Sequence, residues 1–372
     1  MRNNTTKKTI VINNIRNCLL NVIKSKYIRE IIFGYLNKKK FLQLIKYNKK
    51  LQKKINKIIN DYENFIIENK IEIELQIDKY QEEKEEKNYF INFEKEDKPF
   101  IHIYLNNNNK ETKRNYIKKE EFIPTIKIIL DLKFKKFEKL FKDCKCIKTI
   151  RFLKFKRNNI TNINEMFSGC DSLIDIDFSN FNTDNIKYMR SLFAICVKLE
   201  YLDLTIFNTK KVIDFGCMFW LCWSLKIINL SSFKTDNAIY MDEMFRGCSS
   251  LTQLDLTNFN TTNVINMEEM FFGCAGIKYL NLNNFKTDKT VEMERMFNYC
   301  SSLKELDISN FNIDKVKNLD KFFEDSYWLE TVIFPNCSND KLLKLKEGLL
   351  ELKKQRENDN KSERNNFIFN IE

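Results

Sequence analysis

Apolar side chains recur with a step of 26 residues along the middle of the chain, between about residues 137 and 336. Three columns of this pattern keep one residue type through most turns. The first phenylalanine column comprises Phe141, Phe167, Phe193, Phe219, Phe245, Phe271, Phe297 and Phe323. The second comprises Phe155, Phe181, Phe207, Phe233, Phe259, Phe285 and Phe311. The cysteine column comprises Cys144, Cys170, Cys196, Cys222, Cys248, Cys274 and Cys300. Such a fixed period is typical of a solenoid.

Each turn holds two apolar patterns, as in NTTNVINMEEMFFGCAGIKYLNLNNF at residues 260–285. The spacing L-x-x-L-x-L, typical of the strand of a leucine-rich repeat, is carried by Ile277, Leu280 and Leu282. An upstream stripe with steps of three or four comprises Val264, Met267, Met270, Phe271 and Cys274. This stripe predicts a short helix or 3-10 segment. We expect Thr261 and Asn263 to cap its first N–H groups.

The sequence therefore predicts an α/β fold, a leucine-rich repeat solenoid of about eight turns with a strand and a short helix or 3-10 segment in each. A basic helical module and a small strand-rich cap are expected before it. The expected domains are a helical module at 9–70, a strand-rich cap at 71–135, the solenoid at 136–336, a C-terminal capping helix at 337–356 and a frayed tail at 357–372.

Charge divides the chain into a basic head and an acidic body. Residues 1–60 hold 16 Lys and Arg and one acidic residue, whereas residues 164–336 hold 16 Lys and Arg against 24 Asp and Glu. No export signal and no apolar run of about 18 residues is recognisable. We therefore expect a cytoplasmic protein without a membrane span, in which the 11 cysteines stay reduced.

The cysteine column raises the alternatives of metal or disulfide chemistry. Zinc sites use paired cysteines from two nearby segments, but the column supplies one cysteine per turn on an apolar stripe. A small buried side chain in a narrow slot is the favoured interpretation. Cys217 stands in a polar column and is expected to be exposed. We expect no metal and no cofactor.

No pattern typical of an enzyme is present. The sequence has no phosphate-cradling glycine-rich loop. Its single histidine, His102, lies in the strand-like stretch FIHIYL and is expected to be half-buried. The carboxylates of Asp177, Asp203, Asp255 and Asp307 form one outward strand column together with Asn229 and Asn281. A solvated repeat face explains that column better than catalysis does.

Two segments resemble known families. MDEMFRGCSSLTQLDLTNFNTTNV, at residues 241–264, and MEEMFFGCAGIKYLNLNNFKTD, at 267–288, resemble the BspA-type leucine-rich repeats. That resemblance covers about residues 137–336 and implies a curved, stacked solenoid with a protein-interaction role. Residues 27–55 weakly resemble an F-box, with matches at Glu30, Ile31, Phe33, Tyr35 and Leu36. The Leu-Pro before the Glu and the later Trp of that motif are absent.

Varied residues occupy a second outward column, which we call the outward strand column. It comprises Asp175, Tyr201, Ile227, Gln253, Tyr279 and Glu305. Unconstrained drift of exposed positions is one explanation. The other is a specific binding surface anchored by Tyr201, Ile227 and Tyr279, because tyrosine brings a large contact area with a polar tip. The candidate partner-binding residues are these three and the aspartates of the neighbouring column, Asp177, Asp203, Asp255 and Asp307. Trp220 and Trp223 form a rival patch on the opposite side of each turn.

Three functions follow as expectations. The first is a protein-interaction scaffold whose solenoid binds a protein ligand, in its sharper form a substrate receptor that holds a ubiquitin-ligase adaptor through residues 27–55. The second is a surface adhesin of the BspA-like type. The third is nucleic-acid binding through the basic head, against which a solvated lysine-rich face is the simpler interpretation.

Overall fold

The structure is a computed structural model that describes residues 53, 60, 61, 64–78, 87–106, 108–336 and 340–368. The chain divides into two compact units, Met1–Lys70 and Ile71–Glu372. The predicted helical module at 9–70 falls in the first unit. Almost all of it, including the F-box-like segment apart from Lys53, lies outside the described residues.

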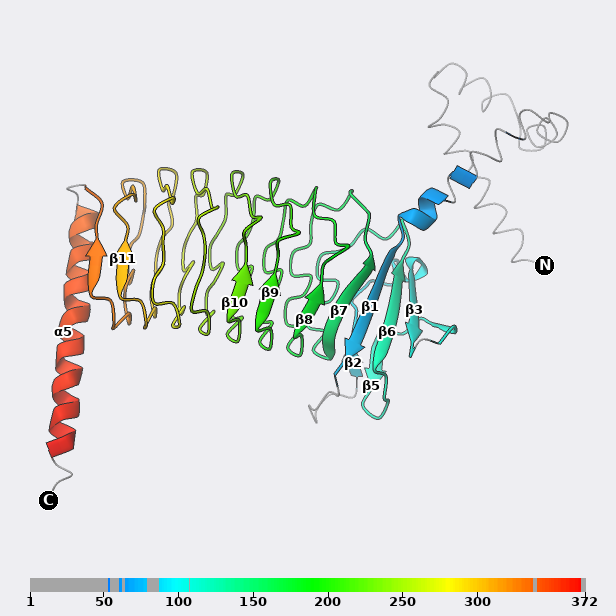
Figure 1. Ribbon diagram of the computed structural model, residues 1–372, viewed down its shortest axis with the longest axis horizontal. Coiled ribbons are helices and arrows are strands. Elements are labelled where there is room, and N and C mark those ends of the chain that lie inside the picture. Colours follow the sequence, from blue (N-terminus) through cyan, green and yellow to red (C-terminus); the bar gives the residue numbers. More distant parts are fainter. Residues whose placement is uncertain are drawn as a thin grey trace, which may run out of the picture. The chain divides into compact units, whose positions relative to one another are not determined.

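Strands and turns predominate in the second unit (Figure 1). Helices are few, and no sheet of the described residues closes into a barrel. The fold is therefore mixed α/β, with most of its regular structure in sheets.

A six-stranded sheet begins this unit, in the spatial order β4-β3-β6-β1-β7-β8. Its strands are β1 (Ile71–Ile77), β3 (Ile101–Leu105), β4 (Glu111–Thr112), β6 (Thr125–Leu130), β7 (Ile147–Lys154) and β8 (Asp175–Asp177). A separate pair joins β2 (Lys87–Tyr89) to β5 (Tyr116–Lys118), and the short 3-10 helix η1 (Lys98–Phe100) precedes β3. Alternate residues of β1 and β6 are fully buried, as their alternating sequences require.

The sheet joins the N-terminal strands directly to the repeats. β7 pairs antiparallel with β1 on one side and parallel with β8 on the other. The N-terminal edge of the repeats is thus paired with β1 through a continuous sheet. In an array without such a cap, the first strand would leave its backbone N–H and C=O groups unpaired on that edge.

Successive turns lie side by side between β8 and the C-terminal helix (Figure 1). Parallel pairing joins β9 (Tyr201–Asp203) to β10 (Ile227–Asn229) and β11 (Glu305–Asp307) to β12 (Thr331–Ile333). A second row of parallel bridges runs along the other side of the turns, for example Tyr188 to Asp214 and Asp214 to Tyr240. The second row of bridges therefore joins neighbouring turns from Asn162 to Asn318, whereas strand pairing joins only some of them.

The prediction of a short helix or 3-10 segment in each turn was wrong. The stretch that ends at the column cysteine, which we call the Met-Phe-Cys segment (residues 266–274 in one turn), forms turns. Residues such as Ser191, Cys217 and Glu243 have φ values of 54–55°. A residue with positive φ interrupts a right-handed helix. The segment instead donates N–H groups to the next turn, as from Cys217 to Asp242 (2.8 Å), Phe219 to Met244 (2.9 Å) and Leu221 to Arg246 (2.7 Å).

The inward columns form the core. The rings of the first phenylalanine column lie nearly parallel through the stack, with centroids 5.5 Å apart between Phe219 and Phe245 and 5.9 Å apart between Phe245 and Phe271. All three side chains are fully buried. Offset stacked rings of this kind add to the hydrophobic contribution of each turn.

The column cysteines are buried free thiols that also make hydrogen bonds. The Sγ of Cys222 donates to the carbonyl of Phe193 (3.0 Å), and the Sγ of Cys248 donates to that of Phe219 (3.2 Å). In the last turn Ser326 takes this position, and its Oγ donates to the carbonyl of Phe297 (2.6 Å). The column therefore satisfies a buried carbonyl in each turn as well as filling a narrow slot.

A buried threonine ties each turn to the next. The Oγ1 of Thr261 donates to the carbonyl of Lys286 (2.8 Å) and accepts from the N–H of the same residue (2.7 Å). Thr209, Thr235 and Thr287 each make the same pair of bonds with a residue of the following turn. These residues are Lys234, Asn260 and Asn312. The prediction that Thr261 and Asn263 cap a helix was therefore wrong, since Thr261 bonds across to the next turn and Asn263 back to Asp236.

The C-terminal helix α5 (Asp340–Ile368) covers the last turn. Its Leu342, Leu345, Leu349 and Leu352 are buried, whereas Leu343 and Leu350 are exposed. Arg356 stacks on Trp328, with 5.3 Å between Cζ and the ring centroid. The helix continues past residue 356, where the sequence predicted a frayed tail, because backbone hydrogen bonds within a helix do not require an apolar face.

Candidate functional site

The outward strand column presents the exposed apolar side chains that the sequence singled out. The exposed fraction is 53% for Tyr201, 60% for Ile227 and 63% for Tyr279. Tyr201 on β9 and Ile227 on β10 are register partners, so their side chains lie next to each other. Tyr279 lies two turns beyond Ile227, about 10 Å away at the usual strand spacing. A shallow hollow surrounds Tyr279 and includes Gln253, Leu254, Glu305 and Ile333.

The neighbouring Asp and Asn column has a structural role that the sequence analysis missed. The Oδ1 atoms of Asp177, Asp203, Asp255 and Asp307 accept from the N–H two residues later, at distances of 2.9–3.0 Å. Asn229 and Asn281 accept in the same way. Such a bond ends a strand by turning the chain. It also holds the pKa of Asp177 and Asp255 below the usual value, since the bonds from Ser179 and Thr257 favour the carboxylate.

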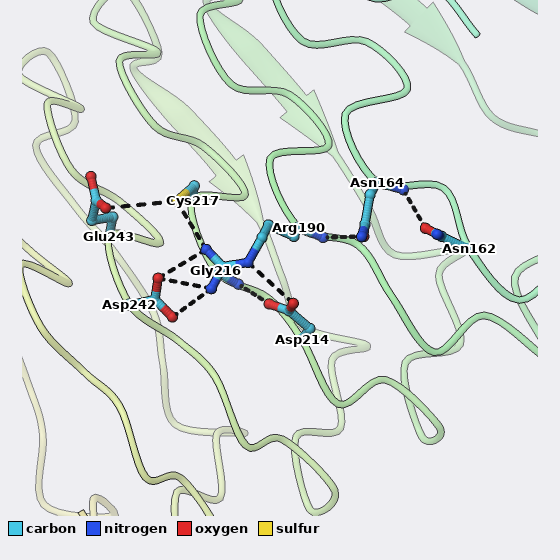
Figure 2. Close-up of polar contacts among 8 residues, drawn as sticks. All are labelled: Asn162, Asn164, Arg190, Asp214, Gly216, Cys217, Asp242 and Glu243. Carbon is cyan, nitrogen blue, oxygen red and sulfur yellow. Dashed lines mark hydrogen bonds and ion pairs between the residues drawn. The ribbon is translucent and has the colours of Figure 1, made fainter. Parts of the chain in front are cut away.

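A polar cluster centred on Arg190 lies in the Met-Phe-Cys segments of three consecutive turns, on the opposite side from the strands (Figure 2). The guanidinium donates from Nη1 and Nη2 to both carboxylate oxygens of Asp242, at 2.8–2.9 Å. Its Nε donates to Asp214 at 3.1 Å. Arg190 thus bridges its own turn to the next two turns.

Gly216 makes this reach possible. A Cβ atom at position 216 would overlap the guanidinium of Arg190. The sequence carried a signal that was not used: the column reads Asn164, Arg190, Gly216, Asp242, Glu268, Glu294, Asp320. One cation and one glycine interrupt a column that is otherwise acidic or amide, and they stand next to each other in space.

The electrostatics of the cluster indicate an internal ion pair. Burial by itself would lower the pKa of Arg190, but Asp242 and Asp214 raise it above its usual value. Burial raises the pKa of Asp214, although this carboxylate accepts the Nε bond of Arg190 and the N–H of Gly216 (2.9 Å). The side chains of Asp214 and Asp242 are 14% and 11% exposed, so neither carboxylate has ready access to water. The bidentate pair therefore replaces lost solvation.

Cys217 lies in the same cluster and differs from the sequence-based expectation. It is half-buried, with Sγ 3.3 Å from Nη1 of Arg190 and 3.9 Å from Oε1 of Glu243. Burial raises its pKa to about 11. A thiol rather than a thiolate is the form near neutral pH, so we expect Cys217 to react slowly with alkylating reagents.

Cys217, Asp242 and Glu243 bring three possible metal-ligand atoms within 4.8 Å of one another. A dication there would lie against the guanidinium of Arg190, which already occupies both oxygens of Asp242. The group is therefore better explained as an ion pair with a neighbouring thiol than as a metal centre.

We expect Arg190→Met to lower the free energy of unfolding by about 2–3 kcal/mol, because it leaves two poorly solvated carboxylates without their cation. Chemical denaturation measures this loss. The matched control is Lys226→Met, which breaks the exposed pair of Lys226 and Glu200 (2.7 Å) and should change stability by less than about 0.5 kcal/mol. Equal losses in the two variants would show that Arg190 contributes no more than a surface charge.

The rival aromatic patch is partly covered. The guanidinium of Arg246 lies over Trp220 and Phe272, with Cζ 5.9 Å and 4.6 Å from the ring centroids. Arg246 also pairs with Glu269. Trp220 is half-buried under this neighbouring turn, while Trp223 remains 50% exposed. The patch thus offers a smaller free aromatic surface than the outward strand column.

His102 lies on β3 with Nδ1 2.9 Å from Glu111 and Nε2 3.2 Å from Asp131. This placement gives both ring nitrogens carboxylate partners on the surface of the N-terminal sheet. These contacts satisfy the polar groups of a histidine that is half-buried on a strand, as the sequence predicted.

The family described as "Mycoplasma protein of unknown function, DUF285" matches residues 135–254 and 239–334, which together make up more than half of the chain. The chain belongs to this family. The DUF285 match covers the stacked turns and is consistent with the resemblance to BspA-type repeats. It does not extend to the F-box-like segment, which stays a prediction. Comparisons with curated proteins and with solved structures gave no match.

DUF285 membership and the fold together describe a repeat protein. Among the described residues, no helix combines the length and the apolar character needed to cross a lipid bilayer.

Proposed function

We propose that this DUF285 protein is a non-enzymatic protein-interaction scaffold, built as a BspA-type leucine-rich repeat solenoid, and that it binds a protein ligand through the outward strand column. The observation that supports this most directly is the pair of adjacent exposed anchors, Tyr201 and Ile227, with Tyr279 on the same column. The core columns are explained by packing and the Asp and Asn column by turn formation. The large exposed side chains of the outward column have no such explanation.

The rim of this surface is polar. Carboxylates of Asp203, Asp255 and Asp307 lie two residues beyond the outward column, on the same face, and remain at least partly exposed. A central aromatic or aliphatic cluster with a polar rim is the usual anatomy of a protein interface. The acidic rim favours partners with a basic contact surface.

We expect the double variant Tyr201→Ala/Tyr279→Ala to weaken partner binding by at least about 2 kcal/mol, or roughly 30-fold. Partners are first identified by affinity purification of the whole chain and mass spectrometry, and affinity is then measured with the purified partner. Gln253→Ala, in the same column, is the matched control and should leave affinity within twofold. Melting of the double variant should change little, because both tyrosines are exposed.

Trp220→Ala tests the rival patch. If it abolishes binding while the double tyrosine variant binds normally, the interaction lies on the Met-Phe-Cys side and the proposed face is wrong.

A surface adhesin is the second candidate, supported by the BspA-type character of the repeats. It uses the same face but places the protein outside the cell. Microscopy of a tagged protein, combined with protease treatment of intact cells, separates the two functions, since only an adhesin would be digested.

A further inference from the structure

Backbone hydrogen bonds of the Met-Phe-Cys segments run in three rows through the whole stack. At the last interface between turns the donors are Arg295, Phe297 and Tyr299, and their N–H groups bond to the carbonyls of Asp320, Phe322 and Glu324 at 2.9–3.2 Å. The same three bonds recur at every earlier interface, in steps of 26 residues. For example, the N–H groups of Glu165 and Phe167 bond to the carbonyls of Arg190 and Leu192. Each turn therefore uses these three N–H groups, among others, to hold the turn that follows.

The last turn has the same three donors and no turn to follow it. They are the N–H groups of Lys321, Phe323 and Asp325, and none of them has an acceptor within the part of the chain that the structure describes. Lys321 and Asp325 keep the positive φ of their columns, 55° and 59°, so the donors have the conformation of an interior turn. Unpaired backbone N–H groups in this conformation can donate hydrogen bonds to the carbonyls of a bound partner.

The opposite end of these rows is closed by the chain itself. Asn92 donates from its backbone N–H to the carbonyl of Leu140 (2.7 Å) and from Nδ2 to the carbonyls of Lys142 (2.5 Å) and Lys139 (3.2 Å). Leu140 and Lys142 stand at the acceptor positions that Met166 and Ser168 occupy one turn later. The N-terminal end of the three rows is thus capped by Asn92, while the C-terminal end keeps unpaired N–H donors within the described residues.

A hollow of about 360 Å³ lies where the next turn would stack, between the last turn and α5. We call it the terminal groove. Its apolar lining comes from Leu319, Phe322, Phe323, Leu345 and Leu352. Its charged lining comes from Asp320, Lys321, Glu324, Lys344, Glu347 and Glu351. Acidic groups outnumber basic ones, which disfavours an anion and favours a ligand with basic side chains.

We propose that the terminal groove binds an extended basic peptide segment of a partner protein, which takes the place of a further turn. Carbonyls at alternate residues of the peptide accept from Lys321 and Phe323, which line the groove, and from Asp325, which follows its lining. The carbonyls of Asp320, Phe322 and Glu324 accept from the preceding turn in the same way. Main-chain pairing at an open edge is an established mode of peptide recognition. This site is separate from the outward strand column and stands independently of the function proposed for it.

The test uses a labelled peptide with the sequence of residues 187–195, KYMRSLFAI, added to the full chain. In the intact protein this stretch presents the carbonyls of Arg190, Leu192 and Ala194 to the preceding turn, and it carries two basic residues. Fluorescence anisotropy measures its affinity, and hydrogen–deuterium exchange follows the amides of residues 319–327. We expect saturable binding that slows exchange in that segment by at least tenfold. A peptide with Glu at both basic positions should bind at least tenfold more weakly.

Gly348 supplies matched variants, since it lines the groove and a Cβ there would meet no atom within 4 Å. Gly348→Phe should fill the groove and weaken peptide binding at least tenfold, whereas Gly348→Ala should stay within twofold. Both replace a glycine within a helix, so neither should lower the melting temperature. The variant Tyr201→Ala/Tyr279→Ala should bind the peptide normally, which separates this proposal from the other surface.

Several results would overturn the proposal. Absence of saturable binding is one, and binding that Gly348→Phe does not weaken is another. Protection of residues 319–327 by inorganic phosphate but not by the peptide would make the groove an anion site. Concentration-dependent dimers that protect the same amides without peptide would assign the groove to a second copy of the chain.

Discussion

Raising the pH from about 9 to 10.5 should destabilise this protein far more steeply than ionisation of exposed side chains would. The seven column cysteines are buried, and burial raises the pKa of each thiol, to about 12 for Cys222 and Cys300. In the unfolded chain a thiol ionises near pH 9. Above that pH the unfolded state loses protons that the folded state keeps. Stability is therefore complete below pH 9 and is lost as the pH rises towards the folded-state pKa.

The size of this effect follows from the number of thiols. Each contributes a slope of up to about 1.4 kcal/mol per pH unit between its two pKa values, so the upper limit for the seven thiols is roughly 10 kcal/mol per pH unit. Urea denaturation in the presence of a reductant, at intervals between pH 8 and 10.5, measures the slope.

The control is the double variant Cys248→Ser/Cys274→Ser. Serine already occupies this column at Ser326, where its hydroxyl makes the same bond to a phenylalanine carbonyl. The variant keeps a donor but removes two titrating groups, so its slope should be smaller by about 2.7 kcal/mol per pH unit. Tyrosine and lysine ionisation is unchanged between the two proteins. Identical slopes would mean that the column thiols ionise equally in both states.

The inward columns could be predicted from the sequence because burial demands the same side chain at each 26-residue step. The local backbone could not. An apolar stripe with steps of three or four is compatible with a helix and with the turns observed, since the stripe records which side chains are buried and not the sign of φ. Non-glycine residues such as Ser191 and Glu243 adopt positive φ, which cannot be predicted from their side chains. A hint came from Gly169, Gly247 and Gly273, which stand in a second column of positive φ four residues further on.

The candidate surface was predicted better than the polar contacts around it. Tyr201, Ile227 and Tyr279 are exposed because the strand phase fixes which residues point outward. The bonds of Asp203 and Thr261 were missed because each requires knowing how the chain turns between one strand and the next. Arg190 was missed because its partner Asp242 lies two turns away, and only the absence of a side chain at Gly216 brings the two together.

Phe245→Ala should lower the free energy of unfolding by about 3–5 kcal/mol, because it leaves a cavity between two stacked rings in the middle of the array. Phe245 is fully buried, and its ring contacts Phe219 and Phe271 in the adjacent turns. The variant therefore weakens two interfaces between turns at once. Tyr279→Ala is the control, since its exposed side chain leaves no cavity and should change stability by no more than about 0.5 kcal/mol.

The same variant should also divide the array into two cooperative parts. Stability in a stacked repeat comes from each turn and its nearest neighbours, so a weak central interface uncouples the turns on either side. The N-terminal part keeps the sheet that caps it through β7 and β8, whereas the C-terminal part keeps only the packing of α5. We therefore expect the C-terminal turns to unfold first. Hydrogen exchange across a urea titration should show amides of residues 271–333 opening before those of residues 147–219. A single coincident transition, with a loss below about 1 kcal/mol, would show that the turns are not coupled through the phenylalanine column.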